Sequence, residues 1–341
     1  MAEPIRCLNC GYVLWGLPAG ACPECGRTFD PENPETYSTH PPFVRWRYWL
    51  PGFLLAVGGG TVLYIFLMLL AGWGLAVTVA APFALGAAIG YGCRAKAWGL
   101  ILLGFAAVII IVTTLFTLSF VGVFCGTVLA AVAMVPTLTG VAIGVSLRRM
   151  LKNSKFEQRW YLPILGLAIA LMAMGLVERI THQPYAVESV VTSVEIPSPL
   201  GKAWNSVMFY EEVHHPPPWL LRWGLPKPLY TRGSVEHVGD TKTCVYSKGH
   251  LTKRVTERDL DRRLAFDIVE QDRIENHAIR LTDGSFDFAA DGPDRTRVDL
   301  TTSYEPKLGP RWIWRPAELL AVHTLHRHIL EGMRRKAAGE S

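Results

Sequence analysis

The stretch GLILLGFAAVIIIVTTLFTL, residues 99–118, carries no charged side chain. A helix of about 20 apolar residues is long enough to cross the hydrocarbon core of a bilayer. This run therefore predicts a transmembrane helix, and four other apolar runs have the same character. The predicted spans are residues 50–71, 74–93, 98–118, 121–147 and 160–178. We expect residues 49–179 to form an all-α transmembrane bundle of about five helices.

Basic residues collect at alternate ends of these runs. Arg45 and Arg47 precede the first run, Arg94 and Lys96 separate the second from the third, and residues 148–159 hold five more. The connections after the first and third runs contain neither Lys nor Arg. Because cytoplasmic loops are enriched in Lys and Arg, this alternation predicts a cytosolic N-terminus. Five spans then predict an extracytoplasmic C-terminal domain in a multi-pass integral membrane protein.

The interior of each run suggests an anchor and not a transport pathway. Charged residues inside a membrane usually mark such a pathway, and these runs carry them only at their edges. Glycine-rich faces, at Gly58 to Gly60, at Gly86 and Gly90 and again at Gly140 and Gly144, predict close helix packing.

Net charge argues against a nucleic-acid partner. Residues 186–341 balance 22 basic against 22 acidic side chains, so the whole +5 comes from residues 1–185. There, most basic residues flank apolar runs, where they act as topology signals.

Four of the seven cysteines form two Cys-x-x-Cys pairs, each followed by glycine: Cys7, Cys10, Cys22 and Cys25. Two such pairs separated by a short loop suit tetrahedral zinc, and a shell of four thiolates makes the zinc structural and not catalytic. The alternatives are a pair of disulfides or a redox dithiol, and a reducing cytosol argues against both. The segment from Arg6 to about Phe29 resembles the zinc-ribbon family. We expect a ribbon over residues 1–30, a proline-rich linker over 31–48 and a protein partner as the ribbon's possible target.

Residues 186–338 change character to a mixture of strands and helices. Strand-like runs occur near 189–196, 243–248, 251–256, 264–269, 285–289 and 297–304, with a hairpin turn at 291–294. A long amphipathic helix is expected from about Pro316, with Leu319, Val322 and His326 at helical spacing. The pattern predicts an α+β domain whose sheet grips its last helix.

Four motifs carry a family resemblance: Ser193-Val-Glu-Ile-Pro-Ser-Pro-Leu-Gly-Lys-Ala-Trp204, Arg263-Leu-Ala-Phe-Asp267, Gly284-Ser-Phe-Asp-Phe288 and Arg295-Thr-Arg-Val298. With the closing helix, they are similar to the SRPBCC superfamily (START-like, polyketide cyclase and lipid transport). The resemblance implies a helix-grip fold with an apolar cavity between sheet and final helix. The residues that we expect to line it are Trp204, Phe266, Phe286, Phe288, Tyr304, Trp314, Leu319, His323 and His326.

The sequence favours a binding module over an enzyme, because it contains no nucleophile elbow, metalloprotease motif or phosphate-binding glycine loop. We expect the C-terminal domain to bind a lipid or another hydrophobic small molecule near the membrane. Two alternatives stay open. One is a membrane scaffold or sensor that links a ribbon-bound partner to ligand occupancy, and the other is an enzyme of the cyclase or hydrolase kind.

Overall fold

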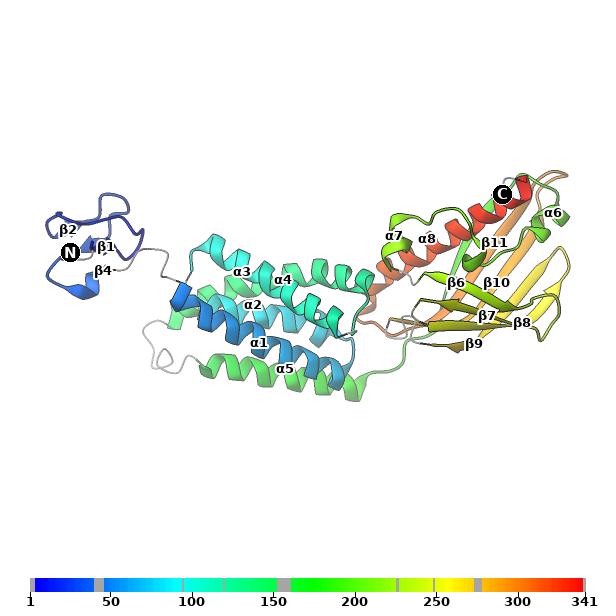
Figure 1. Cartoon of the computed structure of the whole chain (residues 1–341). Helices are drawn as coiled ribbons and strands as arrows, with labels where there is room; N and C mark the ends of the chain where they lie inside the picture. The colour runs from blue at the N-terminus through cyan, green and yellow to red at the C-terminus, as the bar shows by residue number, and fades with distance from the viewer. Residues whose placement is uncertain are drawn as a thin grey trace.

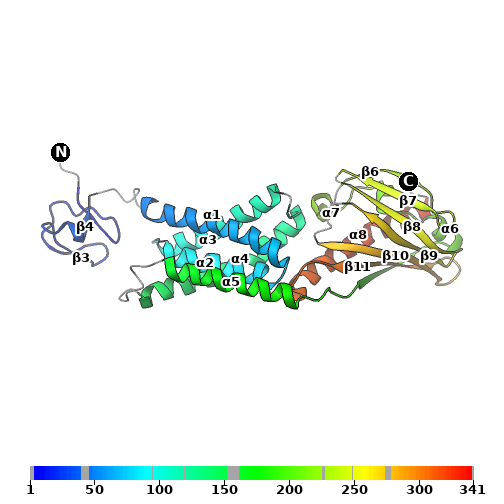
Figure 2. The ribbon, with the colours of Figure 1, turned by 90° about the horizontal axis from the view of Figure 1, so that it is seen from below.

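The computed structural model describes residues 4–39, 46–93, 95–118, 120–151, 161–224, 227–247, 249–272 and 278–339. It contains a small Cys-rich ribbon, a bundle of apolar helices and an antiparallel sheet with a long helix (Figure 1). The first helix of the bundle begins at the end nearest the ribbon, and the last helix ends beside the sheet domain (Figures 1 and 2). Residues 40–45 of the predicted linker lie outside the described residues.

The ribbon consists of four very short strands: β1 (Arg6–Cys7), β2 (Gly20–Ala21), β3 (Thr28–Phe29) and β4 (Tyr37–Ser38). β1 pairs with β4, and β2 pairs with β3. Because β4 pairs back onto β1, the ribbon extends to Ser38, and part of the predicted linker belongs to it. Its core holds only four fully buried hydrophobic residues, Cys7, Leu14, Cys22 and Phe29. So small a core needs a metal or a cross-link to fold.

All five predicted apolar runs form helices. They are α1 (Trp46–Ala71), a π-helical turn (Ala76–Ala80) that continues into α2 (Ala81–Gly92), α3 (Ala97–Thr117), α4 (Val123–Leu151) and α5 (Tyr161–Thr181). Four of them are long and apolar enough to cross a membrane, and the segment Ala76–Gly92 is shorter. Successive helices run in opposite directions, so the chain passes along the bundle five times (Figure 1).

α2 and α4 pack with their backbones in contact. A Cβ atom added at Gly86, Gly90, Gly140 or Gly144 would lie 1.9–2.2 Å from a carbonyl oxygen of the opposite helix. Only glycine leaves room for this approach, so the predicted close packing is confirmed at these four glycines. It is not found at Gly58 and Gly59 of α1, where an added Cβ atom would meet nothing within 4 Å.

The C-terminal domain contains one seven-stranded antiparallel sheet in the order β5-β11-β10-β9-β8-β7-β6. The strands are β5 (Glu188–Ile196), β6 (Pro228–Gly233), β7 (Thr241–Tyr246), β8 (Gly249–Asp259), β9 (Arg263–Gln271), β10 (Ile279–Ala290) and β11 (Thr296–Pro306). Two short helices, α6 (Leu200–Asn205) and α7 (Trp219–Gly224), lie between β5 and β6 along the chain, and α8 (Arg311–Ala338) ends the domain.

α8 lies along one face of this sheet (Figures 1 and 2). On that face, Leu300 pairs with Phe286, and Phe286 pairs with Leu264 on the next strand. Leu330 and Met333 of α8 complete the same buried cluster. A strand, two short helices, six antiparallel strands and a long helix on the sheet resemble the helix-grip arrangement that we expected.

Candidate functional site

The four ribbon cysteines place their sulfur atoms within 4.8 Å of one another. The Sγ atoms of Cys7 and Cys25 are 3.5 Å apart, and those of Cys10 and Cys22 are 3.6 Å apart. Four thiolates at about 2.3 Å from a tetrahedral ion would be about 3.8 Å apart, close to the distances found here. The cluster can therefore bind one metal ion.

A glycine turn follows each Cys-x-x-Cys pair. Gly11 has φ 76° and Gly26 has φ 71°, a region that favours glycine. The N–H of Gly11 donates to the carbonyl of Cys7, and the N–H of Gly26 donates to that of Cys22, both at 2.9 Å. These turns direct both sulfurs of a pair to one point.

The thiols themselves differ in acidity. The backbone N–H of Arg27 and the side chain of Asn9 lower the pKa of Cys25 to about 6. The pKa of Cys10 is raised to about 12, because the lowering effect of the Tyr12 backbone is outweighed by burial and by the other three thiols. Such a cluster readily holds one thiolate but needs a cation to hold four, so the residues present fit a metal ion.

The nine predicted cavity residues fall into four groups, which lie at different positions along the length of α8. Trp204, Phe266, Phe286 and Phe288 share one buried cluster at the end of the domain far from the bundle. Tyr304 and Leu319 belong to a smaller cluster. Trp314 packs in the apolar cluster of the helical bundle. His323 and His326 come between the first two groups along α8. The structure therefore brings four of the nine residues into one cluster, and their role in ligand binding stays a prediction.

The rings of the main cluster contact one another. Ring centroids are 5.3 Å apart for Trp204 and Phe288, and Phe209 lies 5.4 Å from Phe266 and 5.8 Å from Phe286. Edge-to-face pairs at these distances stabilise a core beyond the area that they bury. Phe209, which the sequence analysis did not single out, is central to this packing.

A chain of polar side chains interrupts the apolar interior at the two histidines. The Oγ1 of Thr192 lies 2.8 Å from Nδ1 of His323 and 2.9 Å from Nδ1 of His326, and Nε2 of His326 lies 2.8 Å from Oγ1 of Thr302. A hydroxyl donates one proton and can accept another, so Thr192 can donate to one imidazole while it accepts from the other. The four side chains therefore form a continuous hydrogen-bonded chain.

A pocket of about 570 Å³ opens at one end of this chain, between β5 and α8. β5 lines it with Val191, Thr192, Ser193 and Val194, and α8 lines it with His323, Arg327, Leu330 and Glu331. Of the predicted cavity residues, His323 alone lies in this lining. Thr192 could have been found from the sequence, because Val190, Thr192, Val194 and Ile196 alternate on one face and only Thr192 is polar.

A second polar cluster lies deeper in the domain. The Nζ of Lys253 is 3.6 Å from Oε2 of Glu211 and 4.0 Å from the ring centroid of Phe209, and the hydroxyl of Tyr246 donates to Glu211. The pKa of Glu211 is lowered, because burial, which raises it, is outweighed by Lys253 and Tyr246. The sequence signal for this cluster was a lysine in register with Leu251 and Val255 on the buried side of β8.

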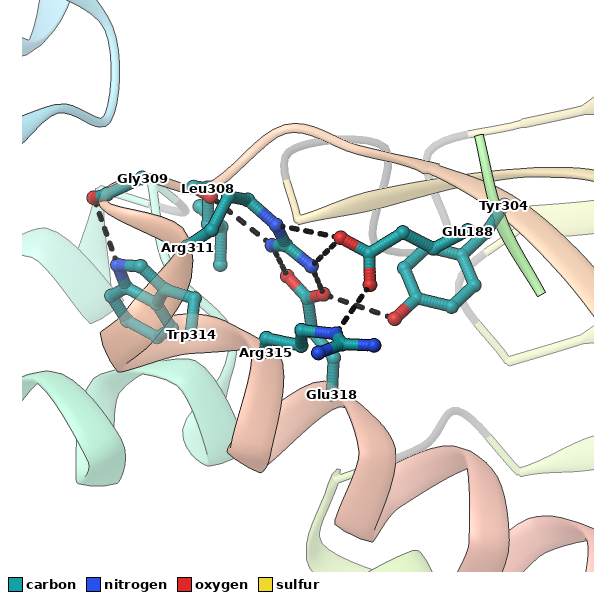
Figure 3. Close-up of polar contacts among 8 residues, drawn as sticks. All are labelled: Glu188, Tyr304, Leu308, Gly309, Arg311, Trp314, Arg315 and Glu318. Carbon is teal, nitrogen blue, oxygen red and sulfur yellow. Dashed lines mark hydrogen bonds and ion pairs between the residues drawn. The ribbon is translucent and has the colours of Figure 1, made fainter. Parts of the chain in front are cut away.

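A third polar network lies at the bundle end of the domain (Figure 3). Arg311 donates to Glu188 at 2.8–3.0 Å and to Glu318 at 2.6–2.8 Å. The hydroxyl of Tyr304 donates to Glu318 at 3.2 Å, and Arg315 donates to Glu188 at 3.1 Å. The pKa of Arg311 is raised, since burial, which lowers it, is outweighed by Glu318 and Glu188. This network ties β5, β11 and α8 together where the domain meets the bundle.

Gly309 joins that network to the bundle itself. Its N–H donates to the carbonyl of Trp73 at 2.7 Å, and its own carbonyl accepts from Thr78 at 2.9 Å and from the Trp314 indole at 3.1 Å. A Cβ atom at Gly309 would lie 2.2 Å from the hydroxyl of Tyr185 and 3.0 Å from the carbonyl oxygen of Trp73, so a larger residue would displace Tyr185. The domain is thus docked directly against the connection between α1 and α2.

Comparisons with known proteins find similarity to this chain only among solved structures. No family model matches the chain, and no curated protein matches it. Norcoclaurine synthase from Thalictrum flavum, in complex with dopamine and hydroxybenzaldehyde, is 10% identical, with a TM-score of 0.34 over 46% of this chain and 89% of that one. The Zhui aromatase/cyclase from Streptomyces sp. R1128 is 18% identical, with a TM-score of 0.31 over 44% of this chain and 96% of that one. At these identities and scores, the similarity assigns no function to this chain.

Proposed function

We propose that this chain is a multi-pass membrane protein whose helix-grip domain binds a lipid or another largely apolar small molecule, and whose ribbon binds structural zinc. The observation that carries the proposal is the pocket between β5 and α8, which joins apolar and polar lining next to a hydrogen-bonded chain. Its volume of about 570 Å³ falls within the usual range for small-molecule sites, roughly 300–1,000 Å³.

Membrane insertion is supported by the surface of the bundle. Only 11–33% of each long apolar window is buried, so most of these residues face outward. In water such a surface would be strongly unfavourable, whereas in lipid it costs nothing. Trp98 at one end of the bundle is 76% exposed, and Trp312 at the other end is 71% exposed. Tryptophan is typical of the two membrane–water interfaces.

The chemistry of the pocket favours an amphipathic ligand. Val191, Val194 and Leu330 offer apolar contacts, while His323 and Arg327 offer hydrogen-bond donors on one side. Within the part of the chain that the structure describes, Arg327 forms no ion pair. A ligand with an apolar body and a polar or acidic group would match both halves of this lining.

The test is native mass spectrometry of the purified full-length chain in detergent, with small molecules retained from its host. Val191→Trp narrows the pocket at a half-exposed position, and Val269→Trp makes the same change on an exposed position of β9 outside the lining. We expect a bound apolar or amphipathic molecule in the wild type and in Val269→Trp, with its loss in Val191→Trp. If the wild type carries no ligand and takes up none from lipid extracts, the proposal is wrong.

The docking of the domain on the bundle favours sensing as a second candidate function. Ligand contacts on α8 and β5 are linked to the bundle through Arg311, Glu188 and Gly309. A change in the position of α8 on ligand binding would therefore reach the helices and, through α1, the ribbon. Hydrogen exchange of residues 73–78 with and without the retained ligand tests this candidate.

A further inference from the structure

The helical bundle contains a cleft of about 820 Å³ that the proposed function does not use. Residues from all five bundle helices line it, and many of them are small. The small residues include Gly52, Gly59 and Gly60 of α1 and Ala84 and Ala88 of α2. Since these residues have no side chain beyond Cβ, the helices leave a hollow where larger residues would fill the space.

The mainly apolar lining includes three polar side chains, Arg148, Tyr64 and Tyr91, and the first two carry the argument. Arg148 lies where α1 begins and α2 ends, and it donates to the carbonyl of Cys93 at 2.7 Å. Tyr64 lies deeper, and its hydroxyl is buried without a hydrogen-bond partner among the described residues. A buried hydroxyl with no partner is destabilising, so a ligand that supplies an acceptor there would be favoured.

The distance between these groups sets the length of a ligand. Gly52 begins the apolar window of α1, and Tyr64 follows it by about 18 Å at roughly 1.5 Å per residue. The hydrocarbon core of a bilayer is about 30 Å thick, so this distance reaches just past its middle. A single extended chain that entered beside Arg148 would reach Tyr64 with its far end.

We propose that the cleft binds a single-chain lipid with an acidic head and an oxygen acceptor near the end of its chain. Arg148 pairs with the head, the glycines and alanines contact the chain, and Tyr64 donates to the distal oxygen. The site is separate from the pocket between β5 and α8. It rests on the proposed placement of the bundle in a membrane.

The test uses the full-length chain in nanodiscs of phosphatidylcholine and a photoreactive palmitate probe. Competitors are palmitate, ω-hydroxypalmitate and palmityl alcohol, and cross-linked peptides are mapped by mass spectrometry. Cross-links are expected on the cleft side of α1 and α2. A hydrogen bond to a charged group contributes about 1.5–3 kcal/mol. The concentration of palmitate that halves cross-linking should therefore be lower than that of palmityl alcohol by a factor of roughly ten or more. The ω-hydroxy acid should compete about threefold better still.

Variants assign each preference to its group. Tyr64→Phe should remove the advantage of ω-hydroxypalmitate, and Arg148→Gln should remove the advantage of the acid over the alcohol. Gly59→Leu should narrow the cleft on the path of the lipid chain and weaken cross-linking. Gly58→Leu is its matched control, since a Cβ at either glycine meets nothing within 4 Å but only Gly59 lines the cleft.

Three results would overturn the proposal. One is equal cross-linking in the two glycine variants, and another is equal competition by all three compounds. The third is displacement by phosphatidylglycerol but not by palmitate. Carbonate extraction of the host membranes distinguishes failure of the lipid site from failure of the membrane placement on which it rests. Release of the protein by carbonate contradicts the membrane placement. If the protein stays in the membrane and any of these three results is found, only the lipid site is contradicted.

Discussion

At the scale of single residues, His326 is held between two hydroxyls inside the domain and is almost fully buried. Burial, with a smaller effect of His323, lowers its pKa from 6.5 to about 3. Between these two values the unfolded chain binds a proton that the folded chain does not. The contribution of neutral His326 to the free energy of unfolding is therefore fully present above pH 6.5. It is lost as the pH falls from 6.5 toward 3, by about 1.4 kcal/mol per pH unit for one such group.

We predict that the domain is about 2 kcal/mol less stable at pH 5 than at pH 7 because of His326 alone. His328, whose pKa burial lowers to about 4, adds to this slope. Thermal unfolding of the full chain in detergent, followed by tryptophan fluorescence, measures the change. His326→Gln should reduce the pH dependence, whereas His237→Gln, at a side chain that is 80% exposed, should not. Identical slopes in all three proteins would mean that another group titrates.

The ribbon cysteines lead to a second prediction at this scale. Cys22→Ser removes one of four ligands, and structural zinc contributes about 10–16 kcal/mol to the folding of small zinc domains. We expect the metal content to fall from about one ion per chain to background and the ribbon to become protease-sensitive. Cys125→Ser, which changes a thiol in α4 outside the cluster, should keep the metal. Plasma emission spectrometry identifies and counts the ion, and iron in place of zinc would correct the proposed cofactor.

At the scale of elements, the contact between α2 and α4 depends on backbone atoms. Gly140→Leu would bring a side chain onto the carbonyl group of Phe83, because even a Cβ atom added at Gly140 would lie 2.1 Å from that oxygen. Overpacking of this kind costs about 1–3 kcal/mol or more, so we expect a lower unfolding temperature in detergent. Gly166→Leu is the control, because a Cβ there on α5 meets nothing within 4 Å. Equal unfolding temperatures of the two variants would show that the contact of Gly140 with α2 does not limit stability.

Regular elements with a strong pattern could be predicted from the sequence, and an element without one could not. The apolar runs, six of the seven strands and the turn at Gly292 were expected, because each has its own periodicity or turn residues. β6 was missed because it follows a Pro- and Trp-rich stretch and begins with Pro228, which an edge strand tolerates. The last helix was expected from about Pro316 but begins at Arg311. There, Pro316 lacks only one helical hydrogen bond, and the ion pairs of Arg311 stabilise the added first turn.

At the scale of the whole molecule, the metal site could be predicted because its ligands are close in the sequence. The pocket could not, because Thr192 and Arg327 are far apart in the chain and meet only through the docking of α8 on β5. Trp314 illustrates the same limit. It was expected to line the cavity, but it packs in the cluster of the helical bundle, with its ring centroid 6.0 Å from that of Trp73.

The order of the three parts leads to a last prediction, about membrane sides. If only the four long apolar helices cross the membrane, both ends of the chain lie on the same side. If the shorter segment Ala76–Gly92 also crosses, the ends lie on opposite sides. Its 17 residues span about 26 Å at roughly 1.5 Å each, close to the bilayer core of about 30 Å. Gly74, just before this segment, lies beside Glu178 near the end of α5, and Gly92 lies beside Gly52 near the start of α1, so the segment reaches from one end of the bundle toward the other. We therefore predict five crossings, with the ribbon in the cytosol and the C-terminal domain outside it. In intact spheroplasts, protease should remove a tag after Ser341 and spare a tag before Met1. If both tags are protected until the membrane is opened, the domain is cytosolic and Ala76–Gly92 does not cross.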